Sequence, residues 1–207
     1  MTKRRRAPEP VQARALATRE SLIEACAALL GDVGVERLST NLICAEAGVT
    51  PPAFYRYFRD KYEILGELGG RLMAAQNAVI EALIADRSAE VSELRLQSVI
   101  AETIEVTRAS SGGPWVLRAL RAVPSLQHVR LNSHRRMAKA LVRYAGRRGA
   151  RAELQARLMI DLGYAAIELA FDEPAMRPQA IAAEAARTLV VLAGDLLPRT
   201  KSAQPRD

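Results

Sequence analysis

Apolar residues recur at intervals of three and four along almost the whole chain, the spacing that places side chains on one face of an α-helix. The first of these stripes consists of Leu22, Ile23, Cys26, Ala27, Leu30 and Val33. A half-buried strand would instead need apolar and polar residues in alternation, and the sequence holds no such run. The pattern predicts an all-α fold, and 207 residues are enough for one or two domains.

Capping residues divide the N-terminal part of this pattern into four expected helices. Serine, threonine and aspartate cap helix N-termini, proline fits the first helical position, and glycine ends helices. These signals predict that the first helix ends near Asp32 and Gly34 and that the second begins at Ser39 and ends at Gly48. The third would begin at Thr50 and Pro51, and the fourth at Asp60. We therefore expect one longer helix, then two short ones, then a fourth.

The helical pattern continues through the C-terminal part of the chain. Further helices are expected at roughly 72–86, 89–109, 114–123, 125–147, 151–171 and 178–197. Gly69-Gly70 lies inside the fourth helical pattern, where each glycine costs about 1 kcal/mol relative to alanine. Two explanations for the pair stay open: close packing between helices, or a compliant point between two domains.

The second and third expected helices are joined by Ala47-Gly48-Val49. Two short helices joined by a glycine turn and followed at once by another capped helix are typical of the helix-turn-helix motif. In that motif the first residues of the second helix, here Thr50 to Ala53, enter the major groove, and the next turn contacts phosphates. The sequence therefore predicts a DNA-binding domain.

The basic residues are concentrated in two stretches of a chain whose net charge is +7. Residues 1–19 hold six lysines and arginines against one glutamate, and residues 106–152 hold eleven basic residues and no acidic one. The first stretch is suited to the DNA backbone or the adjacent minor groove, with an unpartnered tail as the alternative. In the second, Arg135, Lys139 and Arg143 share one helix face, which is typical of a solvated surface.

In its helix-turn-helix residues the chain resembles the tetracycline-repressor (TetR) family of bacterial regulators. The similarity extends over about residues 17–65 and is carried by Leu38-Ser39-Thr40, Ile43, Ala47-Gly48-Val49-Thr50, Phe54-Tyr55-Arg56-Tyr57-Phe58 and Lys61. Family members usually have a polar residue at Leu42, alanine at Cys44 and histidine at Tyr57. The tyrosine keeps a hydroxyl donor, so phosphate binding is expected to survive there, whereas Leu42 has no evident role.

The resemblance implies DNA contacts for two groups of residues in this domain. Thr40 would contact a phosphate and Asn41 a phosphate or a base edge, while the residues facing the bases would be Thr50, Pro51, Pro52 and Ala53. The next turn and the fourth helix would supply backbone contacts through Tyr55, Arg56, Tyr57 and Lys61. Tyr55 is as well suited to the core, and Lys61 is a solvated charge unless DNA is present. From the basic arm, Arg4, Arg5 and Arg6 complete the predicted set.

For the C-terminal half, the resemblance implies a sensor domain with a small-molecule pocket. The residues themselves predict a homodimer, because the expected helices at 151–171 and 178–197 are apolar on more than one face and need cover from a second subunit. Twofold symmetry then implies a palindromic operator. The candidate ligand-binding residues, for each of which ordinary structural roles are the alternative, are Trp115, Arg118, Arg121, His134, Met137, Leu141 and Tyr164.

These observations predict a basic arm over 1–16, a helix-turn-helix domain over 17–65, a ligand-binding and dimerisation domain over 66–200, and a loose tail over 201–207. No cofactor, bound metal or enzymatic activity is expected, because the sequence holds no nucleophile elbow, glycine-rich phosphate loop or metal-ligand cluster. No membrane partner is expected either, since no apolar run approaches the roughly 20 residues of a membrane helix.

The absence of a secretory signal pattern and the two cysteines in apolar helical positions favour the reducing cytoplasm. The function expected is that of a ligand-responsive transcriptional repressor, which binds a double-stranded DNA operator as a homodimer and is released by a small-molecule effector. The alternative is an architectural DNA-binding protein that tolerates many sequences and has no ligand.

Overall fold

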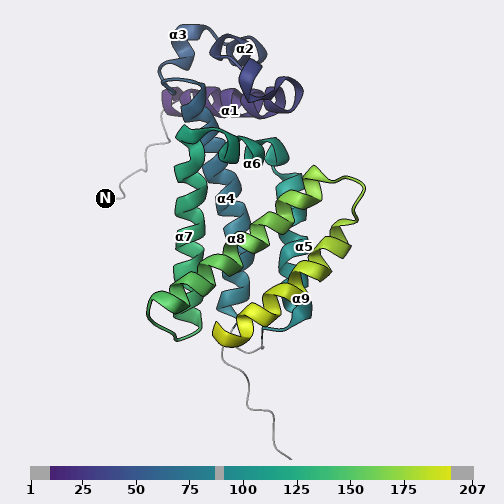
Figure 1. The fold of residues 1–207 in the computed structure, drawn as a ribbon. Helices are drawn as coiled ribbons and strands as arrows, with labels where there is room; N and C mark the ends of the chain where they lie inside the picture. Colours follow the sequence, from purple (N-terminus) through teal and green to yellow (C-terminus); the bar gives the residue numbers. More distant parts are fainter. Residues whose placement is uncertain (1–9, 87–90, 197–207) are drawn as a thin grey trace, which may run out of the picture.

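The computed structural model describes residues 10–86 and 91–196, and within them every regular element is helical (Figure 1). The all-α prediction is therefore confirmed. The elements are α1 (Pro10–Arg37), α2 (Thr40–Glu46), α3 (Pro51–Phe54), α4 (Lys61–Ala85), α5 (Glu93–Ala109), α6 (Gly113–Ala122), the 3-10 turn η1 (Pro124–Leu126), α7 (Gln127–Tyr144), α8 (Ala150–Asp172) and α9 (Pro178–Leu196).

The helices form two layers that share α4 (Figure 1). In the upper layer, α1, α2 and α3 pack around the start of α4. In the lower layer, the rest of α4 packs against α7 and α5, and α9 packs against α5 and α8. None of the described helices is long and apolar enough to cross a membrane.

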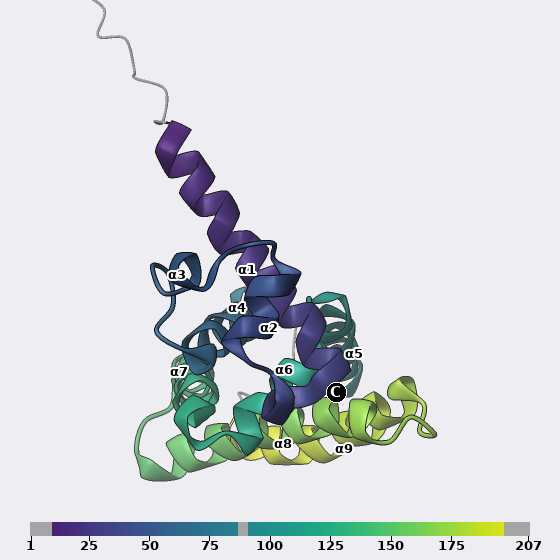
Figure 2. The same ribbon diagram turned by 90° about the horizontal axis from the view of Figure 1, so that it is seen from above.

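The first helix begins earlier than predicted. It begins at Pro10, inside the span expected to be an arm, and proline is accepted there because its missing N–H has no helical partner to lose. At Gly34 a non-helical φ of 71° and ψ of 170° interrupt the helix near the predicted end, and a second helical segment continues beyond this kink to Arg37. Its first turns project away from the body of the molecule (Figure 2). Residues 1–9, and with them Arg4, Arg5 and Arg6, lie outside the described residues.

Helix α4 is continuous through the glycine pair, so the two segments expected around the pair are one helix of 25 residues. It starts as predicted at Asp60, whose Oδ1 accepts hydrogen bonds from the N–H groups of Tyr62 and Glu63. The Glu63 carboxylate reaches back one residue further than in a standard capping box, to the Arg59 N–H at 2.6 Å. These bonds fix where the helix begins.

The two glycines of the pair face different surroundings. Gly69 is buried against α6, and a Cβ added there would lie 2.6 Å from the Cδ2 atom of Leu120, which is itself fully buried. A Cβ added at Gly70 would meet nothing within 4 Å. Close packing therefore accounts for Gly69 but not for Gly70.

An alanine at each position should separate these roles. Both substitutions gain helix propensity, but Gly69→Ala must displace Leu120 in a packed core, so it should be about 1–3 kcal/mol less stable than Gly70→Ala. Urea unfolding followed by circular dichroism measures the difference. Equal stability of the two variants would contradict the packing assigned to Gly69.

Candidate nucleic-acid interface and core cavity

The turn between α2 and α3 is built by local chemistry that the sequence displays. Ser39 caps α2 by accepting a hydrogen bond from the Leu42 N–H at 3.2 Å. Gly48 has a φ of 65°, a left-handed conformation that favours glycine, and the next N–H, that of Val49, returns to the Cys44 carbonyl at 2.9 Å. The fully buried Ile43 lies at the inside of this turn. The predicted helix-turn-helix is present.

The predicted third helix is shorter than expected. Regular helix ends at Phe54, and residues 55–57 continue as a turn in which the Phe58 N–H donates to the Phe54 carbonyl at 3.0 Å. Phe54 and Phe58 are both buried and lie with ring centroids 5.8 Å apart. This aromatic pair anchors a short segment that has little helix of its own.

The described residues predicted to contact DNA lie on α2, on α3, on the turn after α3 and at the start of α4, and none of them is buried. Six are exposed, namely Asn41, Thr50, Pro51, Pro52, Tyr55 and Arg56, and four are half-buried, namely Thr40, Ala53, Tyr57 and Lys61. The hydroxyl groups of Thr40 and Tyr55 lie 3.4 Å apart and join the start of α2 to the end of α3. Tyr55 is 58% exposed, so its ring is not a core residue.

Lys61 has a structural role that the sequence did not reveal. Its Nζ atom donates hydrogen bonds of 2.8 Å to the carbonyls of Val35 and Leu38, at the C-terminal end of α1. A cation at this position satisfies carbonyls that the helix leaves without partners and opposes the negative end of the helix dipole. Because these partners lie more than twenty residues away along the chain, no local pattern could have indicated them.

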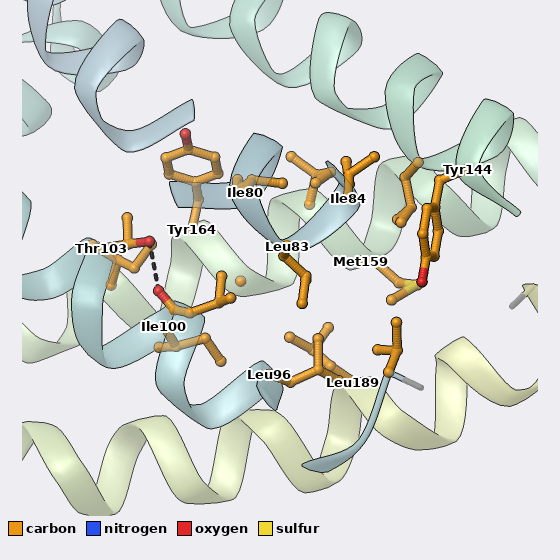
Figure 3. A pocket seen from close by; sticks show the side chains of 16 residues that line it. Ile80, Leu83, Ile84, Leu96, Ile100, Thr103, Tyr144, Met159, Tyr164 and Leu189 are labelled. Carbon is orange, nitrogen blue, oxygen red and sulfur yellow. Dashed lines mark hydrogen bonds between the residues drawn. The ribbon is translucent and has the colours of Figure 1, made fainter. Parts of the chain in front are cut away.

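A cavity of about 70 Å³ lies among α4, α5, α7, α8 and α9 (Figure 3). Thr103 and Tyr164 lie at one end of the view, and Tyr144 and Met159 at the other. All sixteen lining residues are uncharged, and most are aliphatic: Ile80, Leu83, Ile84, Val91, Leu96, Val99, Ile100, Thr103, Leu141, Tyr144, Met159, Ile160, Gly163, Tyr164, Ile167 and Leu189. An apolar space of this kind is suited to an apolar molecule.

The structure brings only part of the predicted ligand set to this cavity. Leu141 and Tyr164 line it. Met137 and His134 are buried in the same domain but are not among the lining residues. The aliphatic lining residues were missed because their spacing is that of any helical core.

The other three residues of the predicted ligand set lie on and beside α6. Arg118 forms an ion pair with Asp172 at 2.9 Å, and Arg121 forms one with Glu168. Trp115 is 42% exposed, lies beside Gly31 of α1, and has the Arg118 guanidinium 4.7 Å from its ring centroid. These side chains connect α6 to α8 and α1 and do not face the cavity.

Behind Tyr164 lies a buried polar cluster. The His134 ring stacks on the Tyr164 ring with centroids 4.1 Å apart, and its Nδ1 atom contacts the carboxylate of Asp161. Burial lowers the pKa of the His134 imidazole, and this effect exceeds the opposing effect of Asp161. The neutral ring, with its proton on Nδ1 toward the carboxylate, is therefore the form expected at pH 7.

An apolar stripe on α8 is exposed to solvent in the single chain. Its members, spaced at three and four residues, are Leu154, Leu158, Leu162, Ala165 and Leu169. On α9 Val191 is 75% exposed and borders the same shallow depression as Leu162. Other large apolar residues of α9, including Ile181, Leu189 and Leu196, are buried in the chain's own core.

The next observations concern possible metal ligands and the two cysteines among the described residues. Residues 10–86 and 91–196 contain no group of three histidine, cysteine or acidic side chains placed to hold a metal ion. Cys26 and Cys44 are both buried and unpaired with each other. Burial raises the pKa of the Cys26 thiol to about 12, so it behaves as an apolar core residue.

Known proteins share both the sequence pattern and the arrangement of these helices. Residues 22–68 match the family model described as bacterial regulatory proteins, tetR family. A TetR-family transcriptional regulator from Streptomyces coelicolor is 23% identical, with a TM-score of 0.64 over 87% of this chain and 99% of its own. None of the curated proteins compared with the chain matches it.

Two further solved structures have the same fold at lower identity. One, described as a putative TetR-family regulator from Syntrophomonas wolfei, is 16% identical with a TM-score of 0.70 over 88% of this chain and 98% of its own. The other is the transcriptional regulator FadR from Bacillus subtilis, solved in complex with stearoyl-CoA. It is 16% identical with a TM-score of 0.66 over 83% of this chain and 97% of its own.

The structural role of Lys61 predicts a loss of stability when its charge is removed. Lys61→Met should lower the free energy of unfolding by about 1–3 kcal/mol, because two carbonyls at the end of α1 lose a charged donor. Arg56→Met, the same type of change at an exposed residue, should alter it by less than about 0.5 kcal/mol. Urea unfolding of both variants tests this, and equal midpoints would show that the Lys61 bonds contribute nothing.

Proposed function

We propose, from the match of residues 22–68 to the tetR family of bacterial regulatory proteins, that the protein is a ligand-responsive transcriptional repressor. It binds a palindromic operator as a homodimer and is released by a small molecule. The observation that carries the proposal is the outward face of α2 and α3, where Thr50, Pro51 and Pro52 are exposed on a buried aromatic anchor.

Few side chains of this surface can contact base edges. Pro51 and Pro52 at the start of α3 donate no hydrogen bond, so Thr50 and Asn41 supply the polar contacts to base edges, and the Ala53 and proline carbons supply apolar ones. Tyr55, Arg56 and Tyr57 contact phosphates, as Thr40 does from α2, and Arg4, Arg5 and Arg6 follow the backbone or the minor groove. Lys61 adds its charge beside this surface while holding the end of α1.

Dimerisation uses the exposed apolar stripe of α8 together with the outer face of α9. A stripe of four leucines on one helix is larger than the scattered apolar residues of an ordinary surface, and a second copy would cover it. The depression between Leu162 and Val191 places both helices on that face. A twofold dimer presents two α3 segments, which is the reason for expecting an inverted repeat in the operator.

Ligand binding is assigned to the apolar cavity. The structural relative from Bacillus subtilis was solved with stearoyl-CoA, a molecule with a long apolar chain, and the uncharged lining here suits an apolar group. Helix α4 supplies Ile80, Leu83 and Ile84 to the cavity and its first turn to the DNA-binding domain. A ligand that displaces the lower part of α4 would therefore change the placement of α3.

The proposal divides the chain within the first two turns of α4, with the DNA-binding domain over 17–65 and the ligand-binding and dimerisation domain over 66–200. A basic segment over 1–16, of which residues 10–16 belong to α1, precedes them, and a tail over 201–207 follows. The proposed activity requires no cofactor and no catalysis, and its place is the cytoplasm, where the chromosome of a bacterium lies.

Binding to duplexes enriched from a random pool tests the DNA-binding assignment. Thr50→Val removes a hydroxyl while keeping the shape, and it should cost about 1–3 kcal/mol on the enriched duplex and little on a scrambled one. Arg56→Ala should weaken both duplexes alike and reduce the salt slope by about 1.

Lys139→Ala is the matched control for the arginine, because Lys139 is exposed on α7, away from α3. It should leave both affinities unchanged. Steep salt dependence with equal affinity for enriched and scrambled duplexes would favour an architectural DNA-binding protein and contradict a sequence-specific repressor.

The dimer predicts that a charge on the exposed face of α8 separates the subunits. Leu158→Arg or Leu162→Arg should produce a folded monomer, because an unpaired charge would be buried at the interface. Leu16→Arg, at a leucine 63% exposed on α1, should remain dimeric. Leu189→Arg does not serve this purpose, since Leu189 is 5% exposed inside the chain's own core and the variant should unfold. Sedimentation measures the states, and folded dimers of both α8 variants would place the interface elsewhere.

A further inference from the structure

The wall of the cavity excludes a charged group from most of its length. None of the sixteen lining residues is charged, and burying an unpaired charge among aliphatic side chains is strongly unfavourable. The polar groups of the lining are the hydroxyl groups of Thr103, Tyr144 and Tyr164. Thr103 and Tyr164 lie together at one end (Figure 3), so that end is where a polar part of a ligand would be received.

Two further polar side chains lie just beyond the lining residues of this end. Gln76 is one helical turn before Ile80 on α4, and Thr107 is one turn after Thr103 on α5. The Gln76 Nε2 atom donates to the Thr107 hydroxyl at 2.7 Å. Both side chains are fully buried.

The donors at this end are all engaged within the protein. The Thr107 hydroxyl donates to the Thr103 carbonyl at 2.7 Å, and the Thr103 hydroxyl donates to the Val99 carbonyl at 2.7 Å. The Oε1 atom of Gln76, by contrast, has no hydrogen-bond partner among the described residues, although the side chain is 0% exposed. Native proteins leave few buried polar atoms without a hydrogen-bond partner.

An acceptor without a hydrogen-bond partner also lies behind Tyr164. With the His134 proton on Nδ1 toward Asp161, the Nε2 atom is an acceptor, and it too has no partner among the described residues. Arg130, one turn earlier on α7, leaves its Nε donor unpaired, but its side chain is partly exposed and interacts electrostatically with Arg121, Asp161 and Arg157. Among the described residues, therefore, the two unpartnered atoms that belong to buried side chains, Gln76 Oε1 and His134 Nε2, are acceptors.

We infer that the ligand of this cavity is an uncharged, largely apolar molecule whose polar end carries a hydrogen-bond donor, a hydroxyl or an N–H group, and extends one helical turn beyond the lining at Thr103 to reach the Gln76 carbonyl oxygen. The inference rests on the proposed function in so far as that function assigns the cavity as the ligand site. An ether or ester of the same size would fill the apolar part but leave Gln76 unsatisfied. A carboxylate would place an anion against acceptors.

Three probes of similar length test this chemistry on the full chain without DNA: octan-1-ol, its isomer 1-methoxyheptane, and octanoate. Isothermal titration calorimetry should show octan-1-ol binding about tenfold more tightly than the ether, the effect of one satisfied buried acceptor, with octanoate the weakest. Gln76→Leu should reduce the preference for the alcohol over the ether to about twofold or less. Gln127→Leu, at an exposed glutamine on α7, should keep the tenfold preference.

Three results would overturn the inference: equal binding of alcohol and ether to the unaltered chain, tightest binding of octanoate, which would point to Arg130, or no binding of any probe. An unchanged preference in a folded Gln76→Leu variant would also overturn the role of Gln76. If that variant does not fold, the comparison of the two isomers on the unaltered chain still decides the chemistry. Binding of the unaltered chain to enriched duplexes is measured separately, so failure of the proposed function is recognised independently.

Discussion

One helix, α4, runs through the hydrophobic core in both layers, and the position of the DNA-binding face relative to the cavity depends on its continuity. Its first turns bury Ile64 and Leu65 beneath α1 to α3, and later turns bury Leu72 and Met73 in the lower layer. Because a packed helix moves as a rigid element, a change at its cavity end cannot stay local. A displacement of α4 in one layer therefore affects the other layer.

Three contacts hold α4 in this position. Lys61 ties its first residue to the end of α1, and Gly69 lets α6 approach closely enough for Leu120 to lie against the helix backbone. On the outer side, Arg71 makes two hydrogen bonds of 2.6 and 2.7 Å to the carboxylate of Glu20 on α1, which lowers the pKa of that carboxyl. Such an exposed ion pair adds little stability, but its two parallel bonds are the geometry in which an arginine recognises a carboxylate most specifically.

The features that the sequence predicted well are those determined by near neighbours. Ser39 and Asp60 cap helices within three residues of themselves, and Gly48 makes its turn with the residues on either side, so the helix-turn-helix could be located without knowledge of the fold. The all-α class followed from the same short-range periodicity. The outward position of Thr50 and Pro51 follows once the turn is known.

The features that the sequence could not predict depend on which helices meet. Leu189 and Leu158 both belong to apolar stripes, yet one lies in the chain's own core and the other at the surface. Trp115 looked suited to a ligand but lies beside α1, whereas Gln76, a polar residue in a long helix, is buried and bonded to Thr107 of α5. Periodicity identifies a buried face but not the partner that buries it.

The account's central claim is that a twofold dimer reads DNA through α3. A hydroxyl-radical footprint of the full chain on its enriched duplex measures this directly. The account predicts two equivalent protected patches on one face of the duplex, related by the symmetry of an inverted repeat and spaced by about 34–36 Å or a multiple of it. A single patch, or uniform protection that ignores the repeat, would contradict it.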